Sequence, residues 1–464
     1  MRMTALALAS LALAGCATFS ADGGFGEVEQ LTRERVGHTP TYLRTGEQAD
    51  SAKARVAQLL EQALTADSAV ELALLNNRDL QASYAQLGIA ESDVVRAGRP
   101  ANPSLRFGRL SNGSATEIDR AVLFDVLGLV TLPLARKAER SRFEQVQLQA
   151  AIDTLAVAGE ARKAFFEAVT AQQLVVYAGQ VKDAADASNE LARRMAAAGN
   201  LNKLAQMREQ SFYSDATAQL ARARHQAVAT RERLTRVLAL GREQLDFRLP
   251  QRLPDLPAAP AESKDAEQAA MDKRLDVLMA RRSTEATAQS LGLTRTTRFI
   301  NVLNAGYQNK SNTGESRMNG YEIELELPLF DFGSTRVARA EATYMQSVNR
   351  TAQVAVNARS EVREAYSAYR TAYDLARHYR DEVVPLRQRI SDENLLRYNG
   401  MLASVFELLT DAKDRIASVT GAVEALRDYW LAESDLQAAL VGRSPDLAQA
   451  RGPASGTVPT PAGH

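Results

Sequence analysis

Residues 321–333 read Tyr-Glu-Ile-Glu-Leu-Glu-Leu-Pro-Leu-Phe-Asp-Phe-Gly, and the first seven alternate between apolar and acidic side chains. Alternation with period two is typical of a β-strand that has one apolar face and one charged face. In a transmembrane barrel, the apolar side chains of such a strand face lipid and the charged ones face a wet lumen. The predicted lipid-facing residues are Tyr321, Ile323, Leu325 and Leu327, and the predicted lumen residues are Glu322, Glu324 and Glu326. A half-buried strand of a soluble sheet has the same alternation, so this strand alone leaves both interpretations open.

Three more candidate strands complete two predicted β-hairpins. Residues 299–309 precede the alternating strand, which is predicted over 318–330. Earlier in the chain, residues 104–110 and 118–132 are divided by the turn-forming cluster Ser-Asn-Gly-Ser at 111–114. Four strands are too few to enclose a water-filled pore, because even a barrel of about eight is filled by its own side chains. An open sheet edge is also intolerable in lipid, so spanning strands would require several chains, and three chains would supply twelve strands.

Long helical segments follow both predicted hairpins. Residues 136–198 are rich in Ala, Glu, Arg and Gln and contain no proline, which predicts a helix about 90 Å long. Gly199-Asn200 interrupts it, and residues 201–240 are predicted to return antiparallel because the connection is so short. A second helical pair is predicted over 334–441, with a kink at Pro385. Shorter helices are predicted before the two β-hairpins, at residues 68–96 and 265–294.

The order of these segments repeats, which indicates an internal duplication. Residues 160–165, Glu-Ala-Arg-Lys-Ala-Phe, match residues 361–366, Glu-Val-Arg-Glu-Ala-Tyr, and Pro133-Leu134 matches Pro328-Leu329. Between the halves, four prolines predict a stiff extended linker. The tail is low in complexity and is predicted to be disordered. The predicted division is 1–15 signal peptide, 16–67 lipidated and extended N-terminal arm, 68–244 first repeat, 245–264 Pro-rich linker, 265–442 second repeat and 443–464 tail.

A heptad seam in the second half predicts side-by-side coiled-coil packing. Its positions follow steps of four and three residues, and its alanines let helices approach closely. The seam comprises Val348, Ala352, Ala355, Val362, Tyr366, Tyr369, Tyr373, Ala376, Val383 and Ile390. Three arginines interrupt it: Arg359, Arg380 and Arg387.

The N-terminus predicts export and lipid attachment. Arg2 precedes an apolar run over 5–14, which is too short to span a bilayer as a helix and is typical of a signal peptide. The run ends in Leu-Ala-Gly-Cys at 13–16, which resembles the bacterial lipobox, in which the cysteine thiol receives a diacylglyceryl group. Cys16 is the only cysteine and the predicted lipid attachment site, and Ala17 in place of aspartate favours the outer membrane. No later stretch is apolar over 18 or more residues, so any membrane span is predicted to be β.

Composition argues against several classes of function. Acidic and basic residues balance at 56 each, so there is no charge excess to attract nucleic acid. One cysteine excludes an intrachain disulfide and CxxC-type zinc or redox sites, and the four histidines form no HExxH motif. No nucleophile elbow, P-loop or metal-ligand cluster is present. We therefore predict a protein that is not an enzyme, with no catalytic residue, cofactor or metal site.

Across residues 68–442, these features together resemble the TolC family of outer-membrane factors. The sequence at 327–333, Leu-Pro-Leu-Phe-Asp-Phe-Gly, looks like the family's junction between strand and helix. Tyr-Asn-Gly-Met-Leu at 398–402, followed by Phe-Glu-Leu-Leu at 406–409, resembles its helix turn at the periplasmic tip. The first repeat departs from the junction pattern, because Leu-Val-Thr-Leu-Pro-Leu at 129–134 lacks Asp-Phe-Gly.

The resemblance implies a mainly α fold with a small β part, in which each chain has duplicated long helical hairpins and two β-hairpins. It implies a homotrimer with a twelve-strand β-barrel in the outer membrane and an α-helical barrel in the periplasm. Such a lipid-anchored channel conducts passively and works with a periplasmic adaptor protein and an inner-membrane pump. The implied adaptor-docking tips are Gly199, Asn200, Leu201, Asn399, Gly400, Met401 and Leu402. Glu407 and Asp411, four residues apart on one helical face, are candidates for a cation-attracting aperture, although solvated carboxylates have the same spacing.

The alternative is a lipid-anchored periplasmic coiled-coil scaffold or adaptor without a pore. It would share the helical hairpins and the acyl anchor. A scaffold, however, has no need of two β-hairpins at equivalent points of a duplication, one of them with a Glu-lined strand. The sequence does not indicate the exported substrate: without a His or Met cluster, drugs, metal ions and other small solutes stay open.

Overall fold

The computed structural model describes residues 18–261, 266–299, 302–326 and 330–442. The predicted signal peptide, Cys16, the junction residues 327–329 and the tail 443–464 lie outside these ranges. The chain divides into two compact units of three segments each. The first unit comprises Met1–Leu31, Ala82–Ala151 and Leu275–Val356, and the second comprises Thr32–Gln81, Ile152–Arg274 and Asn357–His464.

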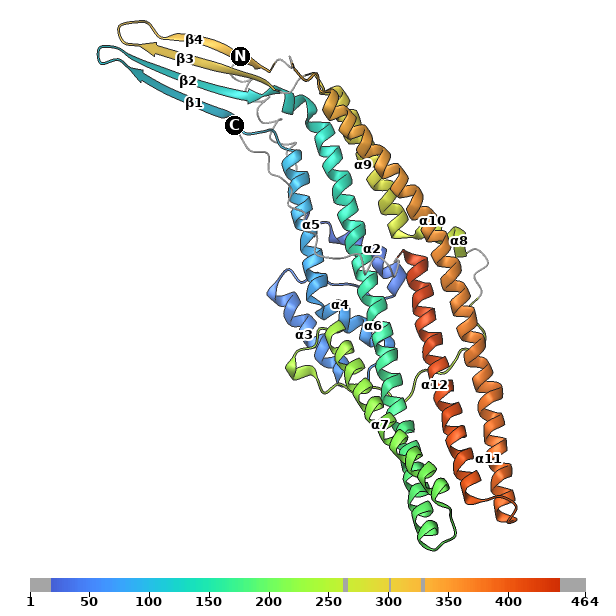
Figure 1. Ribbon diagram of the computed structural model, residues 1–464. Helices are drawn as coiled ribbons and strands as arrows, with labels where there is room; N and C mark the ends of the chain where they lie inside the picture. Colours follow the sequence, from blue (N-terminus) through green and yellow to red (C-terminus); the bar gives the residue numbers. More distant parts are fainter. Residues whose placement is uncertain (1–17, 262–265, 300–301, 327–329, 443–464) are drawn as a thin grey trace. The chain divides into compact units, whose positions relative to one another are not determined.

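The first unit contains an antiparallel sheet whose four strands lie in the order β1-β2-β3-β4 (Figure 1). β1 (Ser104–Ser111) and β2 (Thr116–Asp125) form one hairpin, and β3 (Leu303–Asn312) and β4 (Met318–Leu325) form the other. The two hairpins join through β2 and β3. The two predicted β-hairpins are therefore present, as halves of one sheet.

The second strand of the first hairpin ends earlier than the sequence predicts. The apolar run up to residue 132 favours a strand, whereas β2 ends at Asp125 and α6 (Val126–Ala197) begins at the next residue. The Asp125 carboxylate accepts a hydrogen bond from the Gly128 amide (2.7 Å) and so caps the helix. Pro133 consequently lies inside α6 and not at a strand end. A short apolar run does not by itself distinguish a strand from a helix.

Among the described residues, five helices contribute to the first unit. They are the first part of α2 (Phe25–Val36), α5 (Arg78–Ala97) from Ala82 onward, the beginning of α6, α9 (Leu275–Thr296) and the beginning of α10 (Ser334–His378). Hydrogen bonds between small hydroxyl side chains join α9 to α10. The hydroxyl oxygens of Thr287 and Ser347 lie 2.7 Å apart, and those of Thr284 and Thr351 lie 2.8 Å apart. In the part of the chain that the structure describes, no helix is both long enough and apolar enough to cross a membrane.

The segment predicted as an extended N-terminal arm contains helices instead. α2 and α3 (Gly46–Leu60) occupy much of residues 18–67. Thr45 and Gln48 form a capping box at the start of α3, in which the Thr45 side chain accepts from the Gln48 amide and the Gln48 side chain accepts from the Thr45 amide (3.1 Å). The prediction of an extended arm is wrong for these residues, and the Thr-x-x-Gln spacing was the signal for a helix.

Two predicted helices are each divided in two. Residues 68–96 belong to α4 (Ala66–Asn76) and α5, and residues 265–294 belong to α8 (Ala266–Lys273) and α9. At the first break, the backbone of Asn77 is extended and its side-chain oxygen caps α5 by accepting from the Leu80 amide (3.0 Å). The second break falls at Arg274.

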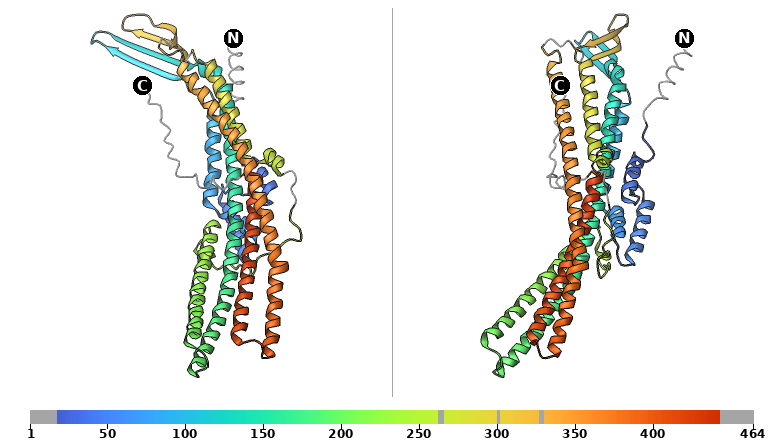
Figure 2. Two further views of the ribbon diagram at one scale, coloured as in Figure 1. Left: turned by 45° about the vertical axis from the view of Figure 1, so that its right-hand side comes forward. Right: turned by 90° about the vertical axis from the view of Figure 1, so that its right-hand side faces the viewer.

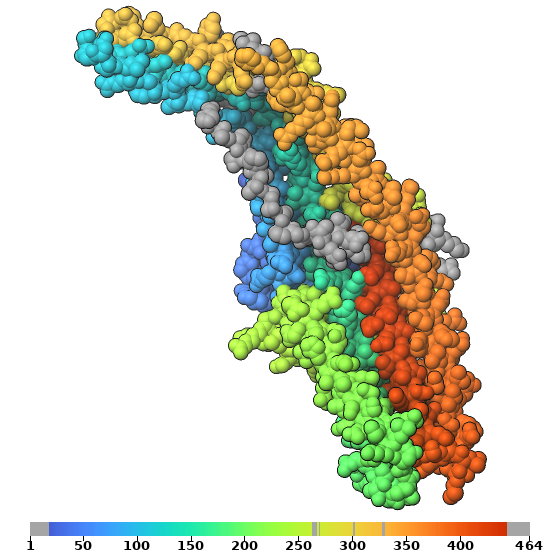
Figure 3. Space-filling view, in the orientation of Figure 1, coloured from blue at the N-terminus to red at the C-terminus, as the bar shows by residue number. Residues whose placement is uncertain are grey.

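Helical hairpins dominate the second unit (Figure 2). The later part of α6 runs antiparallel to α7 (Lys203–Val237), as predicted. The later part of α10 continues through a π-helical turn, η2 (Tyr379–Val383), into α11 (Val384–Asn399). α11 lies side by side with α12 (Val405–Val441), as the space-filling view also shows (Figure 3). A 3-10 turn, η1 (Arg242–Gln244), leads from α7 into the linker.

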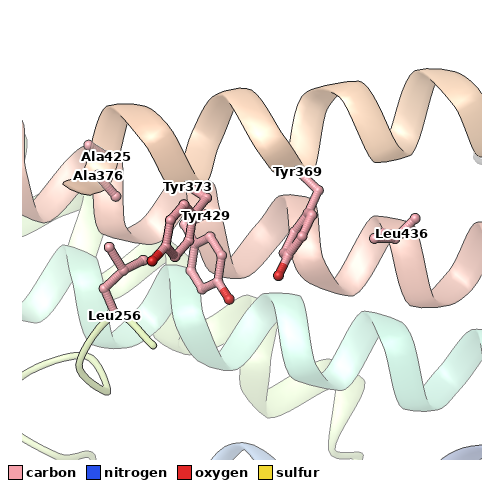
Figure 4. Packing of buried hydrophobic residues seen from close by; sticks show 7 residues of the cluster. All are labelled: Leu256, Tyr369, Tyr373, Ala376, Ala425, Tyr429 and Leu436. Atoms are coloured by element: carbon pink, nitrogen blue, oxygen red, sulfur yellow. The ribbon is translucent and has the colours of Figure 1, made fainter. Parts of the chain in front are cut away.

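One part of the core of the second unit is an aromatic cluster between α10 and α12 (Figure 4). Tyr369 and Tyr373 of α10 pack against Tyr429 of α12, with ring centroids 5.6 and 5.8 Å apart. Val362, Tyr369, Tyr373 and Ala376 are buried seam positions, so the heptad seam is confirmed in this stretch. Beyond it the helix changes character: the π-helical turn directly precedes Pro385, where the sequence predicts a kink.

The Pro-rich linker is tied to this cluster by hydrogen bonds from aromatic side chains. Leu256 packs in the cluster, Tyr373 Oη donates to the Ala258 carbonyl (2.9 Å), and Trp430 Nε1 donates to the Pro254 carbonyl (3.1 Å). Tyr369 Oη accepts from the Ala261 amide (2.9 Å). Because prolines lack an amide donor, the carbonyls of such a segment need partners outside it, and the aromatic side chains supply them.

Candidate functional site

The register of the sheet sorts its side chains onto two chemically different faces. Residues opposite each other in an antiparallel ladder lie on the same face, and faces alternate along each strand. Leu105 lies opposite Val122, which lies opposite Tyr307, which lies opposite Tyr321. We call this side the apolar face; its large side chains include Leu105, Phe107, Phe124, Tyr321, Ile323 and Leu325. We call the other side the polar face; its charged residues are Arg106, Glu117, Asp119, Asp125, Lys310, Glu322 and Glu324.

The apolar face is uncovered in the single chain. Tyr321 is 85% exposed, and Leu105, Phe107, Tyr307 and Ile323 are each more than half exposed. Exposed apolar patches of this kind mark surfaces that contact a protein partner or a membrane. A sheet that stood alone in water would not leave so many large apolar side chains exposed.

The polar face is concave. Arg106 of β1 and Glu322 of β4 form an ion pair (Nη1 to Oε1, 2.8 Å), although their strands lie at opposite edges of the sheet. Three strand spacings would separate these edges by about 14 Å in a flat sheet, so the two side chains reach toward each other over the polar face. Beneath them Ala121 is only 1% exposed. The sheet thus curls around its polar side.

Further side-chain contacts join neighbouring strands on the polar face. Gln308 Nε2 donates to Asp119 Oδ1 (3.0 Å), and Lys310 Nζ lies 4.0 Å from Asp119 Oδ2. Asn304 Nδ2 donates to Glu324 Oε2 (2.9 Å). These bonds join β2 to β3 and β3 to β4 through their side chains, and they hold the carboxylates of Asp119 and Glu324 in place.

The structure places two predicted lumen residues, Glu322 and Glu324, together on the polar face of β4. Glu326 lies just beyond β4, where its amide donates to the Val302 carbonyl (3.3 Å). That these carboxylates line a lumen stays a prediction. Sequence reasoning missed Arg106, the partner of Glu322, although the alternation Leu-Arg-Phe at 105–107 was a usable signal.

The first helical tip ends α6 with a Schellman motif. Gly199 adopts a positive φ of 77°, its amide donates to the Ala196 carbonyl (3.0 Å), and the Asn200 amide donates to the Met195 carbonyl (2.8 Å). Asn202 then caps α7 by accepting from the Ala205 amide (2.8 Å).

The second tip repeats this arrangement with a different residue at its centre. The Met401 amide donates to the Tyr398 carbonyl (2.9 Å), and the Leu402 amide donates to the Arg397 carbonyl (2.7 Å). Met401, and not Gly400, adopts the left-handed conformation, with φ of 60°, and its side chain is 94% exposed. A left-handed backbone is costly for a residue with a side chain, so this tip holds an apolar side chain outward against a backbone preference.

The two aperture candidates lie in different environments. Glu407 is exposed in the first turn of α12, where the Ser404 side chain accepts from its amide (3.2 Å). Asp411, one turn further on, is only 7% exposed. The two carboxylates lie four residues apart on one helical face, as predicted, but they differ in exposure, because Asp411 is buried and Glu407 is not.

The remaining site predictions concern lipid attachment and metal binding. The lipid attachment site Cys16 lies outside the described residues. Within residues 18–261, 266–299, 302–326 and 330–442, no group of three or more His, Cys, Asp or Glu side chains is placed to hold a metal ion.

Residues 266–392 match the family model for outer membrane efflux proteins. Among solved structures, a membrane protein from Pseudomonas aeruginosa is similar at 18% identity and a TM-score of 0.69, covering 87% of this chain and 97% of that chain. CusC, described in connection with transmembrane channel formation, is similar at 17% identity and a TM-score of 0.67, covering 82% and 92%. VceC, an outer membrane protein from Vibrio cholerae, is similar at 16% identity and a TM-score of 0.65, covering 84% and 96%. Among curated protein sequences, none matches.

These similarities establish a mainly helical fold with a small antiparallel sheet over most of the chain. The matched segment 266–392 contains α8, α9, both strands of the second β-hairpin, α10, η2 and the first part of α11, and it ends before α12. The resemblance is thereby confirmed at the level of the fold, and residues 266–392 are similar to the outer membrane efflux protein family.

Proposed function

We propose that this chain is the channel subunit of a tripartite efflux system, and that it conducts solutes passively through the outer membrane. The observation that carries the proposal is the two-faced, curled sheet. Its convex face is apolar and exposed, and its concave face is lined by charged side chains. A membrane barrel with a wet lumen needs this arrangement, whereas a coiled-coil scaffold has no use for it.

Assembly follows from the edges of the sheet. Within the described chain, β1 and β4 each pair with a single neighbouring strand. Unpaired backbone groups are costly in lipid, and four strands do not close around a lumen. Three copies, joined β4 to β1, would form a twelve-strand barrel, with Glu322, Glu324 and Glu326 toward its interior.

The remaining parts take the roles that the family implies. Cys16 anchors the mature chain to the outer membrane, and the helical hairpins extend into the periplasm as a barrel of helices. The two tips, Gly199–Asn200–Leu201 and Asn399–Gly400–Met401–Leu402, dock a periplasmic adaptor, which connects the channel to an inner-membrane pump. Matching Schellman motifs and N-caps at both tips support an origin by internal duplication. Glu407 and Asp411 are the candidates for a narrow aperture beyond the second tip.

The first experiment is a mass measurement. The full chain would be extracted from isolated outer membranes in mild detergent, and its detergent-corrected mass would be determined by light scattering. Three chains per particle, together with ion conductance in planar bilayers, are expected. A monomer that becomes water-extractable once the acyl anchor is removed would contradict the channel and leave the periplasmic scaffold as the better explanation.

A further inference from the structure

The charged residues of the apolar face occupy one end of the sheet. Cross-strand rows on this face can be ordered from the hairpin turns toward the helices. Beyond the uncharged pair Ser111 and Thr116, which borders the first turn, the next row contains Arg109, Ile118 and Ser311. The next row contains Phe107, Arg120, Asn309 and Asn319. Every row further from the turns is apolar, starting with Leu105, Val122, Tyr307 and Tyr321.

Charge is segregated between the two faces. Among the strand residues, Arg109 and Arg120 are the charged residues of the apolar face, and the carboxylates Glu117, Asp119, Asp125, Glu322 and Glu324 all lie on the polar face. The apolar face therefore has a positive end and no compensating acid. Arg109 is exposed, and Arg120 Nη1 donates to Asn309 Oδ1 (3.1 Å), which holds its guanidinium against the sheet surface.

We propose that Arg109 and Arg120 bind the phosphate groups of anionic lipids in the leaflet next to the hairpin turns. This inference rests on the proposed channel function. Strands of 8 and 10 residues match the span of a transmembrane strand, about 9–11 residues, so the turns lie at one boundary of the bilayer. Guanidinium groups bind phosphate in a bidentate manner, and basic side chains at this depth reach the headgroups.

The neighbouring row supports the same depth. Tyr307 and Tyr321 lie opposite each other one row below Arg120 and Asn309. Tyrosine is enriched where a membrane protein passes from hydrocarbon to headgroups, because its ring is apolar and its hydroxyl is polar. Acyl chains would lie along the apolar rows, and the phosphates would meet the two arginines.

The test measures lipid retention by the full-length protein. Purified protein in nanodiscs of phosphatidylcholine would be titrated with a diphosphorylated glycolipid of the lipid A type, and bound phosphate per chain would be counted after mild detergent exchange. R109Q/R120Q should bind the glycolipid about 30-fold more weakly than the unaltered chain, which is the expected effect of two basic residues at an anionic surface.

The matched control is K310Q, which removes one positive charge from the polar face of the same sheet. It should retain the glycolipid as the unaltered chain does. Equal weakening by K310Q, or no weakening by R109Q/R120Q, would overturn the proposal. If the double variant does not assemble, the single variant R109Q is used in its place. R109Q should bind the glycolipid about fivefold more weakly than the unaltered chain. Unchanged binding by R109Q would also overturn the proposal.

The outcome also separates this inference from the proposed function. A protein that forms trimers and conducts ions, yet shows no preference for the phosphorylated lipid, contradicts the lipid site alone. A protein that neither trimerises nor conducts contradicts the channel itself.

Discussion

At the scale of single residues, Met401 holds a backbone conformation that its side chain disfavours. Met401→Gly should remove this cost and stabilise the tip by about 1 kcal/mol, whereas Gly199→Ala should introduce it at the first tip and destabilise by a similar amount. Hydrogen exchange of the Leu402 and Asn200 amides, which close the two Schellman motifs, would measure both effects. Slower exchange in one variant and faster exchange in the other is the expected pair of results. Faster exchange at Leu402 in Met401→Gly would show that the methionine side chain stabilises the turn.

Among the described residues, Arg274 is the largest fully buried side chain, and it lies at the break between α8 and α9. Its guanidinium donates to the Ala439 carbonyl (2.9 Å) and to Glu361 Oε2 (2.7 Å), so one side chain joins the helix break to α10 and α12. Arg274→Ala would leave the Glu361 carboxylate without its buried partner and should cost about 3–5 kcal/mol of unfolding free energy. Denaturant unfolding of the detergent-solubilised protein would measure the loss.

The control for Arg274 is another arginine of the same region. Arg363 is 63% exposed and lies 3.6 Å from Glu267, so Arg363→Ala should cost less than about 1 kcal/mol. Equal losses for the two variants would mean that burial does not distinguish these ion pairs.

Glu433 makes the stability of the second unit depend on pH. Burial raises the pKa of the Glu433 carboxyl above its ordinary value of 4.5, and Arg162 and Gln437 only partly oppose this rise. Because the folded chain holds this proton more tightly than the unfolded chain, stability is greatest below the ordinary pKa and falls as pH rises through the raised one. Glu433→Gln should therefore raise the unfolding midpoint at about pH 8 and leave it unchanged at about pH 4. An equal shift at both pH values would point to packing and not to titration.

At the scale of elements, the sequence predicts those features that local patterns determine. The α6–α7 hairpin, the two β-hairpins and the end of α12 follow from periodicity, turn residues and caps. The breaks at Asn77 and Arg274 were missed, because apolar periodicity continues across both. They are stabilised by distant partners: Asn76 Nδ2 donates to the Ala239 carbonyl (2.9 Å), just as Arg274 reaches the Ala439 carbonyl. No local pattern encodes a partner so far away in the chain.

From Pro254 to Ala261, the linker is held by hydrogen bonds to aromatic side chains of α10 and α12. Tyr373→Phe removes the hydroxyl that donates to the Ala258 carbonyl and should weaken the attachment by about 1 kcal/mol. Limited trypsin digestion should then cleave faster after Arg252, which lies in this segment. Tyr366→Phe, at the edge of the same cluster, is the control and should cleave at the original rate. Unchanged cleavage in Tyr373→Phe would show that packing alone fixes the linker.

At the scale of the whole molecule, the alternation of apolar and acidic residues predicted which side chains line the candidate site. Contacts that depend on the curvature of the sheet were not predictable from the sequence. The Glu residues of β4 are visible in the sequence because they alternate with apolar neighbours. The pairing of Glu322 with Arg106 needs the sheet to curl, and curvature depends on all four strands at once. Likewise, no local signal chooses Met401 over Gly400 for the left-handed position, since glycine is the usual occupant.

Burial in the single chain favours Glu407 over Asp411 as the residue that would line the proposed aperture. Adding further chains removes accessible surface from a residue and does not create it, so Asp411, at 7% exposure, stays covered in a trimer that keeps this fold. Glu407 is exposed at the start of α12 and is free to line a constriction. In planar bilayers under a salt gradient, Glu407→Gln should lower the preference for cations over anions, because a ring of carboxylates attracts cations. Asp411→Asn should leave that preference unchanged and instead alter thermal stability. A shift in reversal potential with Asp411→Asn and none with Glu407→Gln would mean that α12 rearranges on assembly and turns its buried carboxylate toward the pore.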